Sequence, residues 1–481
     1  MTISLNNLQP RRTFCGQMAG GIGAIAMASL LDQDGCLGDE PAGSGILHAP
    51  HVPARAKRCI HVFSPGGVSQ VDTFDHKPAL ETLDGKRLMG KGEIDTFFGK
   101  IGVLRKSFYR FKQHGQSGSW VSSLMPHLAT CADDLTYFHT LVSRSSSHTP
   151  ACFQMNTGFT QVGFPSVGSW LSYGLGTLNN ELPTFVVLPD PRGLPNGGTS
   201  NWSQGFLPAQ HQGIVFRGGT QPVRDLFPPT KQPRGADAAV QKFLSTLNRQ
   251  RTTSPADGLV DARIRSYELA ARMQASVPEV SDLTGEPRHI QDMYGLNNKM
   301  TADCGRRCLL GRRLLEQGVR FVQIYSGGPI AGSPRASWDA HESVRQNHGF
   351  EASRIDRPVA ALLRDLRQRG MLDDTLVLFT TEFGRTPFAQ SAANAVGPGR
   401  DHNRYGFSGW LAGGGVRRGA SYGSTDDVGW KAAENPMPWH DFHATLLHLL
   451  GVNHTDLTYY HNGIQRRLTN VHGEVHTGVF A

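Results

Sequence analysis

Hydrophobic residues recur at helical spacing in two segments of the chain, and each segment is followed by a short run rich in β-branched and aromatic residues. Leucines share one face of residues 306–315, and residues 319–325 (VRFVQIY) follow as a strand. The same order repeats further along: residues 356–370 form a second predicted helix, with Pro358 in its first turn, and residues 375–381 (TLVLFTT) form the strand after it. A helix followed by a strand, twice in succession, predicts a parallel sheet with helices on its faces.

Three more strands are predicted in the first half of the chain, at residues 59–64, 135–141 and 184–188, because β-branched and aromatic residues are frequent there. The first of these strands ends at a Pro-Gly-Gly loop. A helix is expected at residues 261–274, inside a stretch from about 190 to 300 whose beginning is rich in Gly, Asn and Gln. We interpret this stretch as an insertion or cap on an α/β domain.

Composition supports a folded protein with many connecting loops. Of the 481 residues, 38% are hydrophobic and 18% are charged, which excludes wholesale disorder, and 56 glycines and 28 prolines indicate many loops. The formal charge is +8, yet no lysine-rich run or basic stripe occurs, so we expect no nucleic-acid partner. A basic balance suits a small anionic substrate. Seven cysteines without C-x-x-C spacing predict no disulfide framework, and Cys304 and Cys308 are expected on a buried helix face.

The N-terminal segment has the features of an export signal. Residues 10–31 (PRRTFCGQMAGGIGAIAMASLL) place two arginines before a mildly apolar stretch, which is similar to a twin-arginine signal. An amphipathic N-terminal helix is the alternative. Residues 32–57 are interpreted as a linker and residues 58–481 as the folded domain. No other stretch of 18 or more apolar residues occurs, so we expect a periplasmic or extracellular protein that is not inserted in the membrane after export.

Carboxylates and histidines gather where predicted strands end, and in a parallel sheet these ends lie at one edge. The candidate metal ligands are Asp72 after the first strand, Asp339 and His341 after strand 319–325, and Glu382, Asp401 and His402 after strand 375–381. Oxygen and nitrogen donors of this kind can bind zinc, manganese, iron or calcium, and they favour harder divalent ions than thiolate ligands do. For Glu382 and Arg385, a buried ion pair that braces the loop is the alternative to a role at the metal.

Several long motifs resemble the family called domain of unknown function 1501. They include FSPGGVSQVDTFDHKPAL, SYELAARMQ, WDAH, TEFGRTP and GRDHNRYGFSGWLAGGG, and the likeness extends from about Arg58 to the C-terminus. The resemblance implies the fold of alkaline phosphatases and sulfatases, a three-layer α/β/α sandwich with a mostly parallel central sheet. A twin-arginine leader is also usual for that family. The resemblance does not bring an established reaction.

Residues 148–158 (HTPACFQMNTG) are similar to the sulfatase signature C-T-P-S-R-x-x-x-x-T-G. His148 stands where a sulfatase carries its modified nucleophile, at the start of a helix that can hold an oxyanion. His148 could ligate a metal, transfer a proton or attack phosphorus, and the adjacent Thr149 or Ser147 could be the nucleophile instead. Cys152 replaces the arginine of the signature, which argues against the usual sulfatase mechanism. His148, Thr149 and Arg385 are the candidate catalytic residues.

Two classes of function follow. The first is a metal-dependent hydrolase of phosphate or sulfate esters, with a divalent ion and a small or polymeric anionic substrate. The second is a non-catalytic binding or scaffold protein on the same fold. In a glycan-binding form of the second class, Trp202, Phe206 and Trp338 would offer stacking surfaces.

Overall fold

The computed structural model describes residues 45–88, 96–97, 101–218, 222–227, 243, 246, 258–330, 335–390 and 397–481. The predicted leader, residues 1–31, lies outside the described residues. Within the described part of the chain, no helix combines the length and the apolar character that crossing a membrane requires.

A nine-stranded sheet forms the centre of the domain. Its strands are β1 (Arg58–Phe63), β4 (Leu135–Val142), β5 (Phe185–Leu188), β6 (Ile214–Val215), β7 (Phe321–Tyr325), β8 (Thr375–Thr380), β11 (Phe407–Ala412), β12 (Ala420–Tyr422) and β15 (Met437–Pro438). Eight of them follow the order β12-β4-β11-β8-β1-β7-β5-β6, and β15 pairs with β4. Only the pairs that β11 makes with β4 and β8 are antiparallel among these strands. All five predicted strands are confirmed as members of this mostly parallel sheet.

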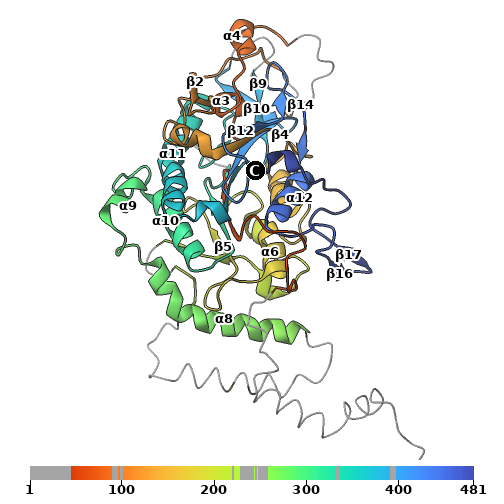
Figure 1. Ribbon diagram of the computed structural model, residues 1–481. Coiled ribbons are helices and arrows are strands. Elements are labelled where there is room, and N and C mark those ends of the chain that lie inside the picture. The colour runs from red at the N-terminus through yellow and green to blue at the C-terminus, as the bar shows by residue number, and fades with distance from the viewer. Residues whose placement is uncertain are drawn as a thin grey trace, which may run out of the picture. The chain divides into compact units, whose positions relative to one another are not determined.

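Helices cover both faces of the sheet. One face carries α8 (Gly258–Ser281), α9 (Arg288–Met293), α10 (Ala302–Glu316) and α11 (Val344–Gln368), and the other carries α5 (His148–Thr157), α6 (Val167–Leu175) and α12 (Trp439–Leu449) (Figure 1). Successive strand residues point to opposite faces. In β1, accordingly, Ile60 and Val62 belong to the first core, whereas Cys59 and Phe63 belong to the second. The expected three-layer α/β/α architecture is confirmed.

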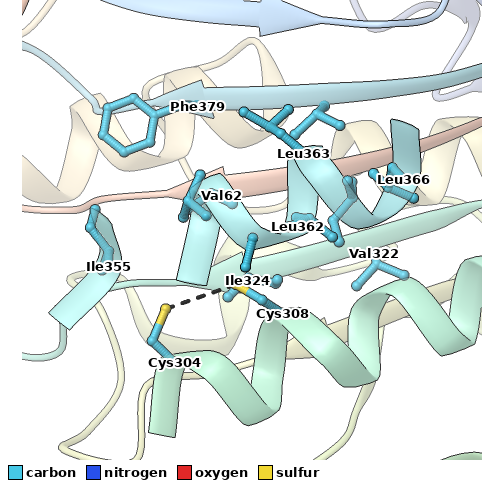
Figure 2. Packing of buried hydrophobic residues seen from close by; sticks show 14 of the residues in the cluster. Val62, Cys304, Cys308, Val322, Ile324, Ile355, Leu362, Leu363, Leu366 and Phe379 are labelled. Atoms are coloured by element: carbon cyan, nitrogen blue, oxygen red, sulfur yellow. Dashed lines mark hydrogen bonds between the residues drawn. The ribbon is translucent and has the colours of Figure 1, made fainter. Parts of the chain in front are cut away.

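The predicted leucine-rich helix is α10, and it packs with α11 against the sheet (Figure 2). Leu362 and Leu366 of α11 lie opposite Val322 and Ile324 of β7 in this core. Cys304 and Cys308 are fully buried one helical turn apart, with their Sγ atoms separated by 3.9 Å. The pair belongs to the buried helix face, as the sequence predicts.

The shorter elements lie around this sandwich. Four two-stranded ribbons are β2 (Phe111–His114) with β3 (Ser119–Ser122), β9 (Gly384–Gln390) with β10 (Gly399–Asn403), β13 (Ser424–Thr425) with β14 (Ala432–Glu434), and β16 (Tyr459–His461) with β17 (Ile464–Arg466). The short helices are α3 (Gln70–Thr73) and α4 (Ala79–Leu83), and the 3₁₀ turns are η1 (Leu128–Asp134), η2 (Gly198–Trp202), η3 (Ala209–His211), η5 (Leu372–Asp374) and η6 (Thr477–Val479).

The start of α11 differs from the prediction. The sequence places it at Asp356, but the helix begins at Val344, where the Ser343 side chain accepts a hydrogen bond from the amide of Gln346. Pro358 lies inside the helix and not in its first turn. The added turns bury His348 and Glu351, and a glutamate is rarely fully buried unless it is paired.

The segment after β8 also differs from the prediction. Residues 384–403 hold the antiparallel strands β9 and β10, which the sequence pattern does not predict. Arg400, Asp401, His402 and Asn403 are all buried in β10. Four of the five residues of β10 are polar, so the strand shows no hydrophobic alternation from which it could be predicted.

The described parts of the predicted cap and of the predicted linker both contact the central domain. In the stretch from 190 to 300, β6 extends the sheet beside β5, and Met273, Val277 and Val280 of α8 belong to the core that α10 and α11 form. In the linker, the Ile46 amide donates to the Tyr173 carbonyl over 3.0 Å, and the Arg55 amide donates to the Leu449 carbonyl over 2.9 Å.

Candidate metal centre

Four side chains from separate parts of the chain converge on one point. The cluster consists of His148, Asp339, His341 and His402, and one ligand atom of each lies within 4.8 Å of the others. His148 is the first residue of α5, Asp339 and His341 lie between β7 and α11, and His402 lies in β10. The sequence predicted a metal role for the last three and named ligation as one role for His148.

Close backbone approaches hold these segments together. At Gly66, just after β1, φ is +115°, and a Cβ atom there would lie 2.5 Å from the Asp339 amide nitrogen, so only glycine fits. At Gly399 a Cβ atom would overlap the His341 carbonyl. Between these contacts, the buried Trp338 donates its indole N–H to the Ser326 carbonyl over 3.2 Å. The loop that carries Asp339 and His341 is therefore fixed on both sides.

An oxygen atom contacts Nδ1 of each histidine in the cluster. His148 Nδ1 lies 2.6 Å from Glu382 Oε1, His402 Nδ1 lies 2.6 Å from the Ser146 carbonyl, and His341 Nδ1 contacts the side-chain oxygen of Gln390. Carboxylate and carbonyl oxygens accept hydrogen bonds, so each imidazole carries its proton on Nδ1 and presents the Nε2 lone pair to the cluster. Histidines that bind metals usually have such partners.

The Nε2 lone pairs face one another and the Asp339 carboxylate. His341 Nε2 lies 2.7 Å from Asp339 Oδ1 and 2.9 Å from His402 Nε2. His148 Nε2 and His402 Nε2 lie 3.4 and 3.5 Å from the same oxygen. His148 Nε2 is buried and makes no hydrogen bond with any residue that the structure describes. Lone pairs that face one another at these distances repel, and a cation between them removes the repulsion.

Two guanidinium groups balance the charge of Asp339. Arg385 Nη2 lies 2.6 Å from Asp339 Oδ1, and Arg335 contacts Asp339 Oδ2. Arg385 is fully buried and also donates to the carbonyls of Gly67 and Arg400, so it cannot turn toward a substrate without losing these bonds. Arg335 reaches solvent, with 23% of its side chain exposed.

The electrostatic surroundings keep the imidazoles neutral. Burial lowers the pKa of His341 to about 3, with a smaller contribution from Arg385. Burial also lowers the pKa of His402 and of His148, and for His148 the hydrogen bond with Glu382 acts in the opposite direction. Burial lowers the pKa of Arg385 to about 9. Neutral imidazole is the form that binds metals, so the histidines are ready for ligation at neutral pH.

The structure does not bring Asp72, Glu382 or Asp401 into the cluster. Asp72 pairs with Arg400 Nε over 2.8 Å and accepts hydrogen bonds from Ser69, Ser107 and the Phe108 amide. Burial acts to raise the pKa of Asp72, but Arg400 and these donors outweigh it and hold the pKa below its usual range. The Asp401 carboxylate accepts the His402 amide over 2.7 Å, and Glu382 accepts the Gly66 amide over 2.8 Å besides His148.

Other predicted residues have mixed outcomes. Thr149 follows His148 in the first turn of α5 and is half-buried. The alternative of an ion pair between Glu382 and Arg385 is wrong, because Arg385 pairs with Asp339 instead. Trp202 and Trp338 are 1% and 0% exposed and offer no stacking surface, whereas Phe206 is half-buried and stacks on His461 with ring centroids 4.7 Å apart.

Three contacts of the centre were missed in the sequence. They are the Gln390 side chain, the Ser146 carbonyl and Arg335. A backbone carbonyl carries no sequence signal. Gln390 and Arg335 lie 49 and 6 residues from His341, and no periodic pattern connects either of them with it.

A family model described as protein of unknown function (DUF1501) matches residues 56–480. The chain belongs to the DUF1501 family. The match contains all four residues of the cluster, so the candidate metal centre lies within the family domain. No curated protein is similar enough in sequence to match this DUF1501 chain.

Solved structures similar to this DUF1501 chain include sulfatases and phosphatases at low identity. The PsFucS1 sulfatase from Pseudoalteromonas sp. is 13% identical with a TM-score of 0.34, and the match covers 85% of this chain and 71% of that one. A phosphonate monoester hydrolase from Silicibacter pomeroyi is 12% identical with a TM-score of 0.32, covering 68% of each chain. A TAB5 alkaline phosphatase mutant with bound Mg is 10% identical with a TM-score of 0.31, covering 75% and 92%.

Proposed function

We propose that this DUF1501 protein is a metal-dependent hydrolase of phosphate or sulfate esters. The observation that carries the proposal is the convergence of three imidazole Nε2 atoms on Asp339 Oδ1, each imidazole being held through Nδ1 by an oxygen. A site built only for stability would not set neutral lone pairs against one another. The chain's positive charge is compatible with an anionic ester.

The donor set fits a divalent transition metal. His148, His341 and His402 would supply nitrogen and Asp339 would supply oxygen, a combination that favours zinc or iron over calcium, which prefers oxygen alone. A divalent ion in such a site polarises an ester and makes a neighbouring hydroxyl group or water easier to deprotonate. Glu382 and Gln390 would orient His148 and His341.

The protein's own groups supply the remaining roles. Both ring nitrogens of His148 are directed at other groups of the centre, so we assign His148 to metal binding and not to attack. Thr149, one residue further along the first turn of α5, is the candidate nucleophile. Arg335, at the solvent edge of the cluster, is placed to attract an anionic substrate, whereas Arg385 keeps Asp339 in position.

Elemental analysis tests the metal centre directly. We expect near-stoichiometric divalent metal in the purified protein and its loss in the Asp339→Ala, His341→Ala double variant. His289→Ala, which changes an exposed histidine, is the matched control and should keep the metal. A protein that stays metal-free after incubation with zinc, iron and manganese contradicts the proposal.

Turnover separates the hydrolase from a non-catalytic protein on the same fold. The metal-loaded protein should hydrolyse aryl phosphate or aryl sulfate esters, and Thr149→Ala should reduce the rate while leaving the metal in place. A metal-loaded protein with no activity on either class would favour the binding or scaffold function, which the engagement of both His148 nitrogens also supports.

We also propose export by the twin-arginine route, from the two arginines and the apolar stretch of residues 10–31. Replacement of Arg11 and Arg12 by lysine should retain the protein in the cytoplasm in a cell-fractionation experiment. Unchanged export of the variant would contradict this route.

A further inference from the structure

A cavity of about 290 Å³ lies apart from the metal centre, among α3, α4 and the chain that leads into β2, near the top of Figure 1. Its volume is close to the lower end of the range for small-molecule sites, about 300 Å³. None of the side chains around it belongs to the cluster of His148, Asp339, His341 and His402. The cavity therefore has its own chemistry.

Positive charge predominates in the wall. Lys77, Lys106 and Arg110 line the cavity, with Lys77 already paired with Asp75 over 3.1 Å, and Glu81 is the acidic residue among the lining side chains. Lys106 pairs with Glu81 over 3.3 Å, but both side chains are about half exposed, and such a pair has little net stability. Arg110 is exposed and makes no ion pair with any described residue. Lys106 and Arg110 are thus available to an anionic group.

Aromatic rings form the other part of the wall. Phe108, Tyr109 and Phe111 are half-buried and line the same cavity as the cations. His76 also lines it and packs against Phe111 with ring centroids 5.0 Å apart. Ring faces offer large, rigid apolar surfaces on which the C–H groups of a sugar ring pack. Aromatic faces beside exposed guanidinium and ammonium groups match a sugar that carries a negative charge.

The wall is held in place before any ligand arrives. The Phe108 amide and Ser107 Oγ donate to Asp72 Oδ1 over 2.8 and 3.1 Å, and Arg105 and Arg400 each lie over the Phe108 ring at 5.3 Å. Tyr109 donates its hydroxyl to the Arg345 carbonyl over 2.6 Å. A wall fixed in this way loses little conformational entropy when it binds a ligand. The contacts also give a role to Asp72, which the metal centre does not use.

We propose that this cavity binds an anionic saccharide. One sugar ring lies against Tyr109 and Phe111, and Arg110 with Lys106 holds a sulfate, phosphate or carboxylate group on that ring or on its neighbour. The proposal goes beyond the hydrolase function and does not depend on it, because the lining residues are separate from the metal ligands.

Titration calorimetry of the full chain tests the proposal with four probes: a sulfated oligosaccharide, an oligouronate, a neutral oligosaccharide of the same length, and inorganic sulfate. We expect at least one charged oligosaccharide to bind about tenfold or more tightly than the neutral one and than sulfate, because charge-assisted hydrogen bonds and ring packing act together. Binding should weaken as the salt concentration rises.

Substitutions test whether the oligosaccharide binds in the cavity. The Lys106→Ala, Arg110→Ala double variant should bind the charged oligosaccharide about tenfold or more weakly than the parent protein. Lys112→Ala, which removes an exposed cation outside the cavity, should leave this affinity unchanged. Asp339→Ala, His341→Ala should keep full affinity even if it loses metal and activity. The proposal is overturned if the protein binds the neutral oligosaccharide or sulfate as tightly as the charged oligosaccharide. It is also overturned if the Lys106 and Arg110 changes leave the affinity unchanged, or if the Asp339 and His341 changes abolish binding.

Discussion

Glu382 receives the Nδ1–H group of His148 and the amide of Gly66 on one carboxylate, which is fully buried. In Glu382→Gln a neutral amide oxygen replaces the charged carboxylate as the acceptor of both donors, so the hydrogen bond that orients His148 weakens. We expect the affinity for the metal to fall by about 10- to 100-fold while the fold is kept. Competition with a chromophoric chelator measures this affinity.

The matched control is Glu286→Gln. Glu286 is also a buried carboxylate, but it pairs with Arg312 and Arg313 on the helical layer of α10. The control should lower stability and leave the metal affinity unchanged. Equal weakening in both variants would show that Glu382 acts through general stability and not through His148.

His61 and His443 line one small cavity between β1 and α12, and burial holds the pKa of each at about 3. Both pKa values are lower in the folded state than the unfolded value near 6.5, so the unfolded chain binds more protons. Their contribution to stability is complete above about pH 6.5 and is lost as the pH falls, by roughly 1.4 kcal/mol per pH unit for each histidine.

Urea unfolding at several pH values between 7 and 4 tests this pH dependence. His443→Gln should show a shallower loss of unfolding free energy with falling pH than the parent protein. His289→Gln, at an exposed position, should keep the parent slope. If the His443→Gln slope equals the parent slope, the neutral buried state of His443 is not a source of acid sensitivity.

At the scale of elements, α6 lies so close to β5 that glycine is needed at their contact. A Cβ atom on Gly168 would approach the Phe185 ring to 2.6 Å. Alanine gains about 1 kcal/mol in helix propensity but costs about 1–3 kcal/mol in overpacking, so Gly168→Ala should lower stability by about 1 kcal/mol. Gly285→Ala, where a Cβ atom meets open space, should cause no such loss in urea unfolding. Equal stability of the two variants would mean that the Phe185 ring moves aside freely.

Elements with an apolar face could be predicted from the sequence, and elements with a polar buried face could not. The leucines of α10 and the runs of β7 and β8 follow hydrophobic periodicity directly. The first turns of α11 bury His348, which accepts the Ser69 amide, and Glu351, which pairs with Arg192. Such partners come from distant segments, so no local pattern reveals that these positions face inward.

The same reason limits prediction of the site. Asp339, His341 and His402 could be chosen because they follow strands whose ends meet at one edge of the sheet. The division between residues that face the centre and residues that orient them depends on where individual side-chain atoms lie, which strand order does not determine. Glu382 and Asp401 were therefore grouped with the ligands, although the structure uses them to hold His148 and the β10 backbone.

At the scale of the whole molecule, one sheet supplies side chains to both cores, so we expect the two layers to unfold together. Cys152 belongs to the core on the α5 side and Cys308 to the core on the α10 side, and both are fully buried. Their reactivity toward a thiol reagent, mapped by mass spectrometry at graded urea concentrations, should rise with the same midpoint. An added surface thiol, Lys112→Cys, should react at every concentration. A lower midpoint for one of the two buried thiols would show that its layer opens separately.

Arg335 and Arg385 neutralise Asp339 before any metal ion arrives. In small zinc domains the ion supplies the free energy of folding, so such chains remain unfolded until they are loaded. Here large apolar cores lie on both sides of the sheet, so we expect the chain to fold without an ion. The proposed centre would then take up its ion after folding, and the supply of metal where loading takes place would decide which ion it binds.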